Sequence, residues 1–255
     1  MDYDSLLNTS STLGLLLLQS GAEAYRVEDS LLRLCRAYGA DRTEVFAIPS
    51  LLIVSICDPE GHSHTRVRRL YQGGTDLHRV ARLNDLCRRV CRQPPELPLV
   101  DRELEALSRE PGPTYLRRLG GFAFVAAFFT LLFGGGWRDA LCALAAGCVI
   151  CFSKYFLEGL RANSFFVTTA CSFLAALTAV AGVELGLGRQ LDKIIIGAFM
   201  GLVPGVAITN FMRDLLAGDL FSGITKLADS LLTATAIALG AGMALALARY
   251  LGGAL

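Results

Sequence analysis

Residues 162–183 read ANSFFVTTACSFLAALTAVAGV, a run of 22 positions without a charged side chain. A helix needs roughly 20 predominantly apolar residues to cross the hydrocarbon core of a bilayer. This run reaches that length without including any flanking charged residue. It therefore decides the fold class, and we predict an α-helical integral membrane protein.

Four further uncharged blocks repeat the pattern on either side of this run. The shortest, residues 140–153, has only 14 uncharged positions, and it becomes long enough if Lys154 extends its ammonium group to the membrane surface. The transmembrane domain, residues 114–255, is thus expected to contain about five helices. The predicted spans lie near residues 119–137, 139–157, 162–183, 194–212 and 230–248.

The first part of the chain has a different composition. Residues 1–118 hold 16 of the 24 Lys and Arg residues and 16 of the 23 Asp and Glu residues. Apolar spacing and turn residues predict a helix over 5–39, interrupted by polar residues 19–23, which could divide it into two helices. Strands over 43–57 and 62–71 and helices over 76–93 and 101–109 are expected to follow. Residues 1–113 therefore predict a small α+β domain, with Pro49 at an edge or a bulge of the first strand.

The orientation of the chain follows from its termini and flanks. The N-terminus, Met1-Asp-Tyr-Asp, is acidic and does not resemble a signal peptide, so we expect a multi-pass protein of the cytoplasmic (inner) membrane with a cytoplasmic N-terminal domain. Basic residues are enriched in cytoplasmic flanks. In this orientation six of them flank the cytoplasmic ends: Arg117, Arg118, Lys154, Arg161, Arg213 and Lys226. Four flank the opposite ends: Arg138, Arg189, Lys193 and Arg249.

The fourth apolar block leads into a polar segment. Pro204-Gly205 removes a backbone donor and predicts a helix break at that point. Beyond it, Asn210, Arg213 and Asp214 have the i, i+3, i+4 spacing of one helix face. Charges next to membrane-spanning sequence usually face a polar pathway or a partner. The segment is therefore a candidate transport site.

Each charged group of this segment has a candidate role. The Arg213 guanidinium suits a carboxylate through paired hydrogen bonds. Asp214 or Asp219 could carry a proton or pair with Arg213. The alternative is an ordinary cytoplasmic loop in which Arg213 and Asp214 cap a helix end, and these residues alone favour neither interpretation.

A second polar cluster interrupts the first helical pattern at Ser20, Glu23, Arg26 and Glu28. Ser20 and Glu23 have the spacing of a capping box at a helix start. An enzymatic interpretation would use Ser20 as a nucleophile, but no histidine stands at a recognisable motif position to activate it. The chain carries no phosphate-binding loop. We therefore expect neither an enzyme nor a cofactor.

Other binding functions have little support. His62 and His64 alternate on a predicted strand, with Cys57 across the turn, but a site for a metal requires further ligands that the sequence does not indicate. We expect no metal site. The net charge of +1 gives no reason to expect nucleic-acid binding.

Three segments together resemble the threonine/serine exporter family. They are residues 19–29, reading QSGAEAYRVED; Asn84, within RLNDL; and the positions from Pro204 to Gly223, namely Pro204-Gly205, Asn210, Arg213-Asp214, Gly218-Asp219 and Ser222-Gly223. The resemblance covers nearly the whole chain. It implies export of small hydrophilic metabolites, namely threonine and serine in fused members and dicarboxylates such as succinate in a split form. The chain is similar to the larger subunit of the split form, which implies a separate small membrane subunit.

The leading hypothesis is a subunit of a secondary exporter for small hydrophilic metabolites that bear a carboxylate. In it Arg213 binds the carboxylate, Asn210 adds hydrogen bonds, and Asp214 or Asp219 serves as ion partner or proton carrier. Two alternatives stay open: a membrane-tethered hydrolase or ligand-processing domain, and a scaffold or sensor that transports nothing. The expected partners are the small subunit, the substrate and the lipid bilayer, and a homo-oligomer is left open.

Overall fold

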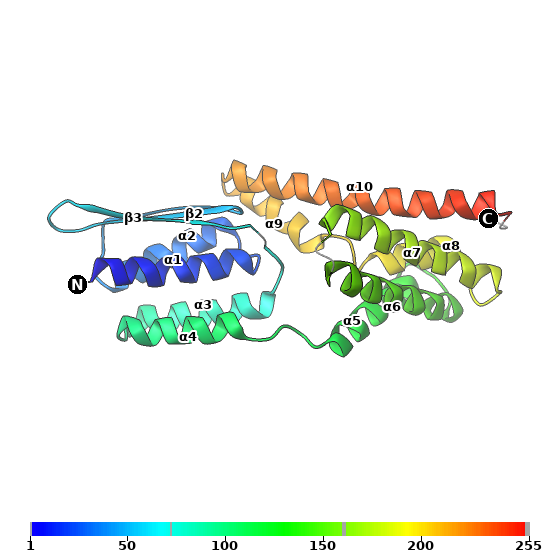
Figure 1. Cartoon of the computed structure of the whole chain (residues 1–255), viewed down its shortest axis with the longest axis horizontal. Coiled ribbons are helices and arrows are strands. Elements are labelled where there is room, and N and C mark those ends of the chain that lie inside the picture. Colours follow the sequence, from blue (N-terminus) through cyan, green and yellow to red (C-terminus); the bar gives the residue numbers. More distant parts are fainter. Residues whose placement is uncertain (1, 72, 160–161, 253–255) are drawn as a thin grey trace. The chain divides into compact units, whose positions relative to one another are not determined.

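A computed structural model of the chain describes residues 2–71, 73–159 and 162–252 (Figure 1). The chain divides into two compact units. The first unit is Met1–Pro111 together with Val206–Leu227, and the second is Gly112–Gly205 together with Ala228–Leu255. The polar segment that follows the Pro-Gly break thus groups with the N-terminal part of the chain, although it falls within the range assigned from sequence to the transmembrane domain.

The first unit contains an antiparallel sheet with the strand order β1-β2-β3. Its strands are β1 (Thr43–Ile48), β2 (Leu51–Cys57) and β3 (Ser63–Arg69). The prediction of one strand over 43–57 was wrong, because Ile48 pairs with Leu51 across a hairpin turn formed by Pro49 and Ser50. Proline has a fixed φ and no N–H to donate, so it fits a turn better than the interior of a strand ladder.

Four helices complete the N-terminal part of this unit. They are α1 (Tyr3–Gln19), α2 (Ala24–Ala37), α3 (Leu77–Arg92) and α4 (Leu97–Arg109). The division of the first predicted helix at residues 19–23 is confirmed. Helix α4 begins earlier than the predicted residue 101, because Pro98 lies in its first turn, where the missing N–H has no helical partner to lose.

Helix α1 lies in the middle of this unit, with the sheet on one side and α3 and α4 on the other (Figure 1). Three β2 side chains that alternate along the strand, Leu52, Val54 and Ile56, are fully buried. The helix approaches them closely, since a Cβ on Gly14 would lie 2.7 Å from the side chains of both Leu31 and Leu52. This tight apolar core holds the end of α1 and the start of α2 in place.

The second unit consists of helices. They are α5 (Tyr115–Leu132), α6 (Trp137–Gly159), α7 (Ser164–Glu184), α8 (Leu191–Phe199) and the larger part of α10 (Leu220–Tyr250). Alanines form much of its core, and such small side chains let helices pack closely. At the α5–α8 contact, a Cβ on Gly197 would lie 2.7 Å from the backbone N of Thr130 and 2.9 Å from the backbone O of Ala126.

Within the described residues, four helices are long and apolar enough to cross a membrane: α5, α6, α7 and α10. Five spans were predicted, and the difference lies at residues 194–212. Helix α8 ends at Phe199 and α9 (Gly205–Leu216) begins directly after Pro204, a residue that lacks the N–H a continuous helix needs. Arg161, one of the flanking basic residues, lies outside the described part of the chain.

Candidate functional site

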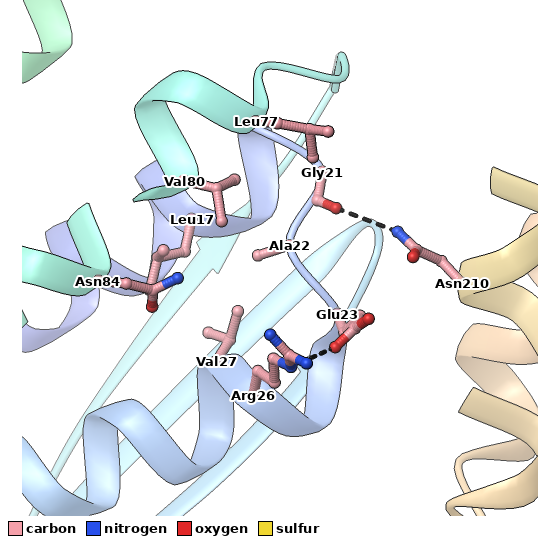
Figure 2. A pocket seen from close by; sticks show the side chains of 10 residues that line it. All are labelled: Leu17, Gly21, Ala22, Glu23, Arg26, Val27, Leu77, Val80, Asn84 and Asn210. Carbon is pink, nitrogen blue, oxygen red and sulfur yellow. Dashed lines mark hydrogen bonds and ion pairs between the residues drawn. The ribbon is translucent and has the colours of Figure 1, made fainter. Parts of the chain in front are cut away.

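Helix α9 joins the two polar segments that the sequence presented separately. The Arg213 Nη1 atom donates a hydrogen bond to Glu23 Oε1, although the two residues are 190 positions apart. The Asn210 side-chain amide donates to the backbone oxygen of Gly21 at 3.4 Å (Figure 2). Segment 19–29 and the second half of α9 therefore form one polar cluster within the first unit.

The turn between α1 and α2 shapes one side of this cluster. Gly21 has a φ of +85°, and a Cβ there would lie 2.8 Å from the backbone oxygen of Gly74, so only glycine fits. The predicted capping box was wrong: Ser20 ends α1, and Glu23 precedes α2 without a side-chain capping bond. The cause is the backbone turn at Gly21, which separates the two residues into the end of one helix and the start of the next.

The Ser20 hydroxyl gives no support to the enzymatic alternative. Ser20 is 2 % exposed, and its Oγ has no hydrogen-bond partner among the described residues. A nucleophilic serine needs a neighbouring base to take its proton. The geometry around Ser20 therefore lacks the group on which that hypothesis depends.

Two arginines surround the buried Glu23 carboxylate. Its side chain is 8 % exposed; Arg213 contacts Oε1, and Arg26 Nε lies 2.5 Å from Oε2. The Arg26 Nε–H donates instead to the Tyr25 hydroxyl at 3.1 Å, and Oε2 receives no hydrogen bond from the described residues. The ion partner of Arg213 is thus Glu23, rather than either aspartate that the sequence suggested.

Asp214 belongs to a different ion pair. Its side chain is completely buried, and Lys226 Nζ, at the start of α10, donates to Asp214 Oδ2 at 2.7 Å. Asp219 accepts a hydrogen bond from the backbone N of Ser222 at 3.2 Å, so it caps the start of α10. The residues predicted to share one helix face therefore divide: Asn210 and Arg213 contact the α1–α2 turn, whereas Asp214 pairs with α10.

Glu28 connects α2 to the sheet close to this cluster. Its Oε1 accepts a hydrogen bond from the backbone N of Ala47 at 2.8 Å. Burial raises the pKa of the Glu28 carboxyl, the hydrogen bond from Ala47 lowers it, and the negative charge of Asp219 raises it again. The net result is a pKa above the ordinary glutamate value, so Glu28 takes up a proton more readily than a solvated carboxylate.

A small cavity of about 100 Å³ opens beside the cluster. Its polar lining includes Glu23, Arg26, Asn84 of α3 and Asn210 of α9, and the remaining lining is largely apolar (Figure 2). The structure therefore gathers four residues that the sequence singled out, from α3, α9 and the α1–α2 segment, around one cavity. Arg213 reaches it only through Glu23.

Sequence reasoning missed Asp139, a buried residue of the second unit. Its Oδ1 accepts hydrogen bonds from the backbone N atoms of Arg189 at 2.6 Å and Gln190 at 3.1 Å, and its Oδ2 accepts from that of Gly136 at 2.9 Å. These bonds tie the start of α6 to the connection between α7 and α8. Its only sequence signal was a lone acidic residue at the edge of an apolar block.

The β2–β3 turn carries one group with the spacing of metal ligands. One ligand atom each from Asp58, Glu60 and His62 lies within 4.8 Å of the others. The Asp58 carboxylate also contacts His64, with Oδ2 3.6 Å from Nε2. Glu60 and His62 are exposed, and Cys57, considered from sequence, is not part of the group. Exposed carboxylates of this kind are common without an ion, and they carry no site assignment here.

Comparison with known proteins gives a consistent result. The sequence model of one family, described as "Putative threonine/serine exporter", matches residues 8–248. The "Probable succinate transporter subunit YjjP" of Klebsiella aerogenes is 28 % identical over 236 residues, which is 91 % of this chain and 89 % of that protein. The protein of the same name from Escherichia coli K12 is 27 % identical and covers 91 % of this chain and 90 % of its own length.

A longer relative matches as well. The "Threonine/serine exporter" of Corynebacterium glutamicum is 23 % identical over 255 residues, and the match covers 96 % of this chain and 52 % of that protein. These three relatives carry the names of transporters or exporters, and none of them carries the name of an enzyme. No solved structure matches this chain.

Proposed function

The chain belongs to the threonine/serine exporter family, and from this premise we propose that it is a subunit of a secondary exporter. The substrates are small hydrophilic metabolites with a carboxylate group, such as threonine, serine or succinate. The observation that supports this proposal best is the contact between Arg213 and Glu23. It brings two segments, each with the family's pattern, to one polar cluster beside the start of α10, a helix long enough to cross a membrane.

The Arg213 side chain is the proposed anchor for the substrate carboxylate. It is 53 % exposed while it pairs with Glu23, so a carboxylate from solvent can reach the guanidinium and compete for its donors. Asn210, one turn earlier on α9, supplies further hydrogen bonds. In this proposal Glu23 occupies the place of the substrate carboxylate when no substrate is bound.

The acidic residues of the segment supply the proposed coupling site. Asp214 is fully buried against Lys226, and charged groups next to membrane-spanning sequence usually face a polar pathway or a partner. Asp219 sets the start of α10 and lies close enough to influence the charge of Glu28. In this proposal the break at Pro204 and Gly205 opens the helix between α8 and α9.

The proposed setting is the cytoplasmic membrane, with the first unit in the cytoplasm and a second, smaller membrane subunit as partner. The charge-rich composition of residues 1–118 supports a position of the first unit outside the bilayer. The names of the two relatives that match over most of their length, both called subunits, support the need for a partner.

Efflux of labelled serine, threonine and succinate tests the proposal in cells that express the chain with its partner. Arg213→Gln and Asp219→Asn each remove one charge and keep a polar side chain, so we expect efflux to fall to background while the protein stays in the membrane at normal abundance. The matched control is Arg89→Gln. Arg89 pairs with Glu103 on the surface of the first unit, and exposed pairs contribute little to stability.

Two outcomes would count against the proposal. Efflux at the wild-type rate in both variants would remove the site assignment. A wild-type complex that assembles stably in vesicles but moves none of the three compounds would favour the scaffold or sensor instead.

A further inference from the structure

Strand β3 directs a row of basic side chains toward helix α1, which packs against it. His64, Arg66 and Arg68 alternate along the strand and are half-buried, whereas the residues between them are exposed. The strand lies at one edge of the sheet, and charged residues that point inward from an edge strand protect it against edge-to-edge pairing. The groups that face the row on α1 show whether this is its only role.

The two arginines of the row converge on one neutral oxygen atom. Arg66 Nη1 donates a hydrogen bond to Asn8 Oδ1 at 2.5 Å, and Arg68 Nη2 donates to the same atom at 3.1 Å. Arg68 Nε also donates to Ser11 Oγ at 3.4 Å. The shared acceptor holds two positive charges within a few ångströms of each other, where like charges repel. The amide oxygen of Asn8 carries no net charge, so it does not compensate this repulsion.

Carboxylates do not compensate the pair either. Neither Arg66 nor Arg68 takes part in an ion pair with any residue that the structure describes. The acidic groups near this strand contact His64 instead, whose Nδ1 lies 3.5 Å from Asp4 Oδ1 and whose Nε2 lies 3.6 Å from Asp58 Oδ2. The two arginine charges therefore lack a counter-charge within the described part of the chain.

Both guanidinium groups retain donors for a ligand. A guanidinium has five N–H donors, of which the described residues take one from Arg66 and two from Arg68. Both side chains are partly exposed, so a small solute can reach them, while their partial burial limits the screening of their charge by salt. Guanidinium groups are well suited to phosphate oxygens, which they bind through paired hydrogen bonds.

We propose that Arg66 and Arg68 form a binding site for a small phosphate-bearing anion between β3 and α1. A phosphate monoester carries about −1.5 to −2 charges at pH 7, which matches two arginines, whereas a carboxylate or the phosphodiester of a lipid headgroup carries a single charge. Asn8 is a positioning residue, because it holds the two guanidinium groups side by side. The site shares no residue with the Arg213–Glu23 cluster, and the inference does not depend on the proposed function.

Equilibrium dialysis of radiolabelled inorganic phosphate against the purified full chain in detergent tests this proposal. We expect saturable binding. Arg66→Gln and Arg68→Gln should each lower the affinity roughly ten- to hundredfold, as expected for the loss of a charge-assisted hydrogen bond. The matched control is Arg69→Gln, at the next residue of the strand, whose side chain points to the opposite face and lies over the Tyr71 ring. This variant should bind phosphate like the wild type.

Thermal unfolding separates a binding role from a structural one. A ligand that binds only the folded chain raises the unfolding temperature. Phosphate should therefore stabilise the wild type and Arg69→Gln, but neither Arg66→Gln nor Arg68→Gln. Each of these two variants tests the site by itself, so the second remains informative where the first folds poorly.

Competition experiments identify the kind of anion. Sulfate, a tetrahedral dianion, should displace phosphate, whereas acetate and dihexanoyl phosphatidylglycerol, a soluble lipid with one phosphodiester charge, should each displace it at least tenfold less well. Acetate that competes as well as sulfate would overturn the proposal, as would the lipid binding more tightly than phosphate. Phosphate affinity that is unchanged in both Arg66→Gln and Arg68→Gln would also overturn it and leave the row with the protection of the sheet edge alone.

Discussion

The ion pair between Asp214 and Lys226 allows structural and transport roles to be separated. Removing the charge of Lys226 by Lys226→Met leaves a carboxylate that is completely buried, and its Oδ1 already receives no hydrogen bond from the described residues. Breaking a buried pair from one side typically costs 3–5 kcal/mol, because the remaining charge is uncompensated. Since Asp214 has no solvent contact, we expect about 4 kcal/mol for this variant.

The double variant Asp214→Leu/Lys226→Met provides the matched comparison. It removes both charges and leaves apolar groups of similar size, a replacement that is often neutral or stabilising. Thermal unfolding of the purified chain in detergent measures both effects. At roughly 2–4 °C per kcal/mol for a chain of this size, the single variant should unfold about 8–16 °C below the wild type. The double variant should unfold close to the wild type.

Efflux from cells carrying the same variants then separates the roles. If the pair handles the coupling ion, the double variant is stable and transports nothing. A double variant that is stable and exports at the wild-type rate would refute the ion role and leave a purely structural pair. A single variant that unfolds at the wild-type temperature would refute the energetic argument itself.

Two further predictions concern packing and pH. Gly197→Ala should lower the free energy of unfolding by about 1–3 kcal/mol, because the new Cβ would lie 2.0 Å from Thr130 Oγ1 and 2.7 Å from the Thr130 backbone N. Thermal unfolding measures this effect. The control is Gly121→Ala, whose new Cβ meets nothing within 4 Å, and it should unfold at the wild-type temperature. Burial raises the pKa of Glu28 above its ordinary value of 4.5, so the folded chain retains a proton that the unfolded chain has lost, and stability should fall as pH rises through the window above 4.5. Glu28→Gln should flatten this part of the stability–pH curve, and parallel curves for variant and wild type would contradict the assignment.

The fold could be predicted from the sequence where local signals and packing agree. The uncharged run of residues 162–183 corresponds to α7, and most of the run 119–137 lies in α5, because a run of that length has few stable structures other than a helix. The prediction from local sequence was wrong at Pro49, where the segment predicted as one strand forms the two strands of a hairpin. The prediction was also wrong at residues 194–212, where the uncharged run is long enough for one membrane span but is divided at Pro204 into α8 and α9. The length of an uncharged run does not show where a proline removes a backbone N–H and interrupts the helix.

The sequence predicted the separate motifs of the site but not which of their residues contact one another. Each motif could be recognised along the chain, and so could the suitability of Arg213 for a carboxylate. The capping box assigned to Ser20 and Glu23 was wrong, because the backbone turns between them at Gly21. Asp139 was missed because its partners are backbone N–H groups up to 51 positions away.

The sequence by itself determined the class of the protein and its family. Both depend on residue order along the chain: apolar runs long enough for a bilayer, and two polar motifs in succession. Only the tertiary structure decided which charges meet. Glu23 pairs with Arg213 across 190 positions, whereas Asp214, next to Arg213 in the chain, pairs with Lys226. The physical reason is that ion pairs act over a few ångströms, and the folding of the backbone sets such distances.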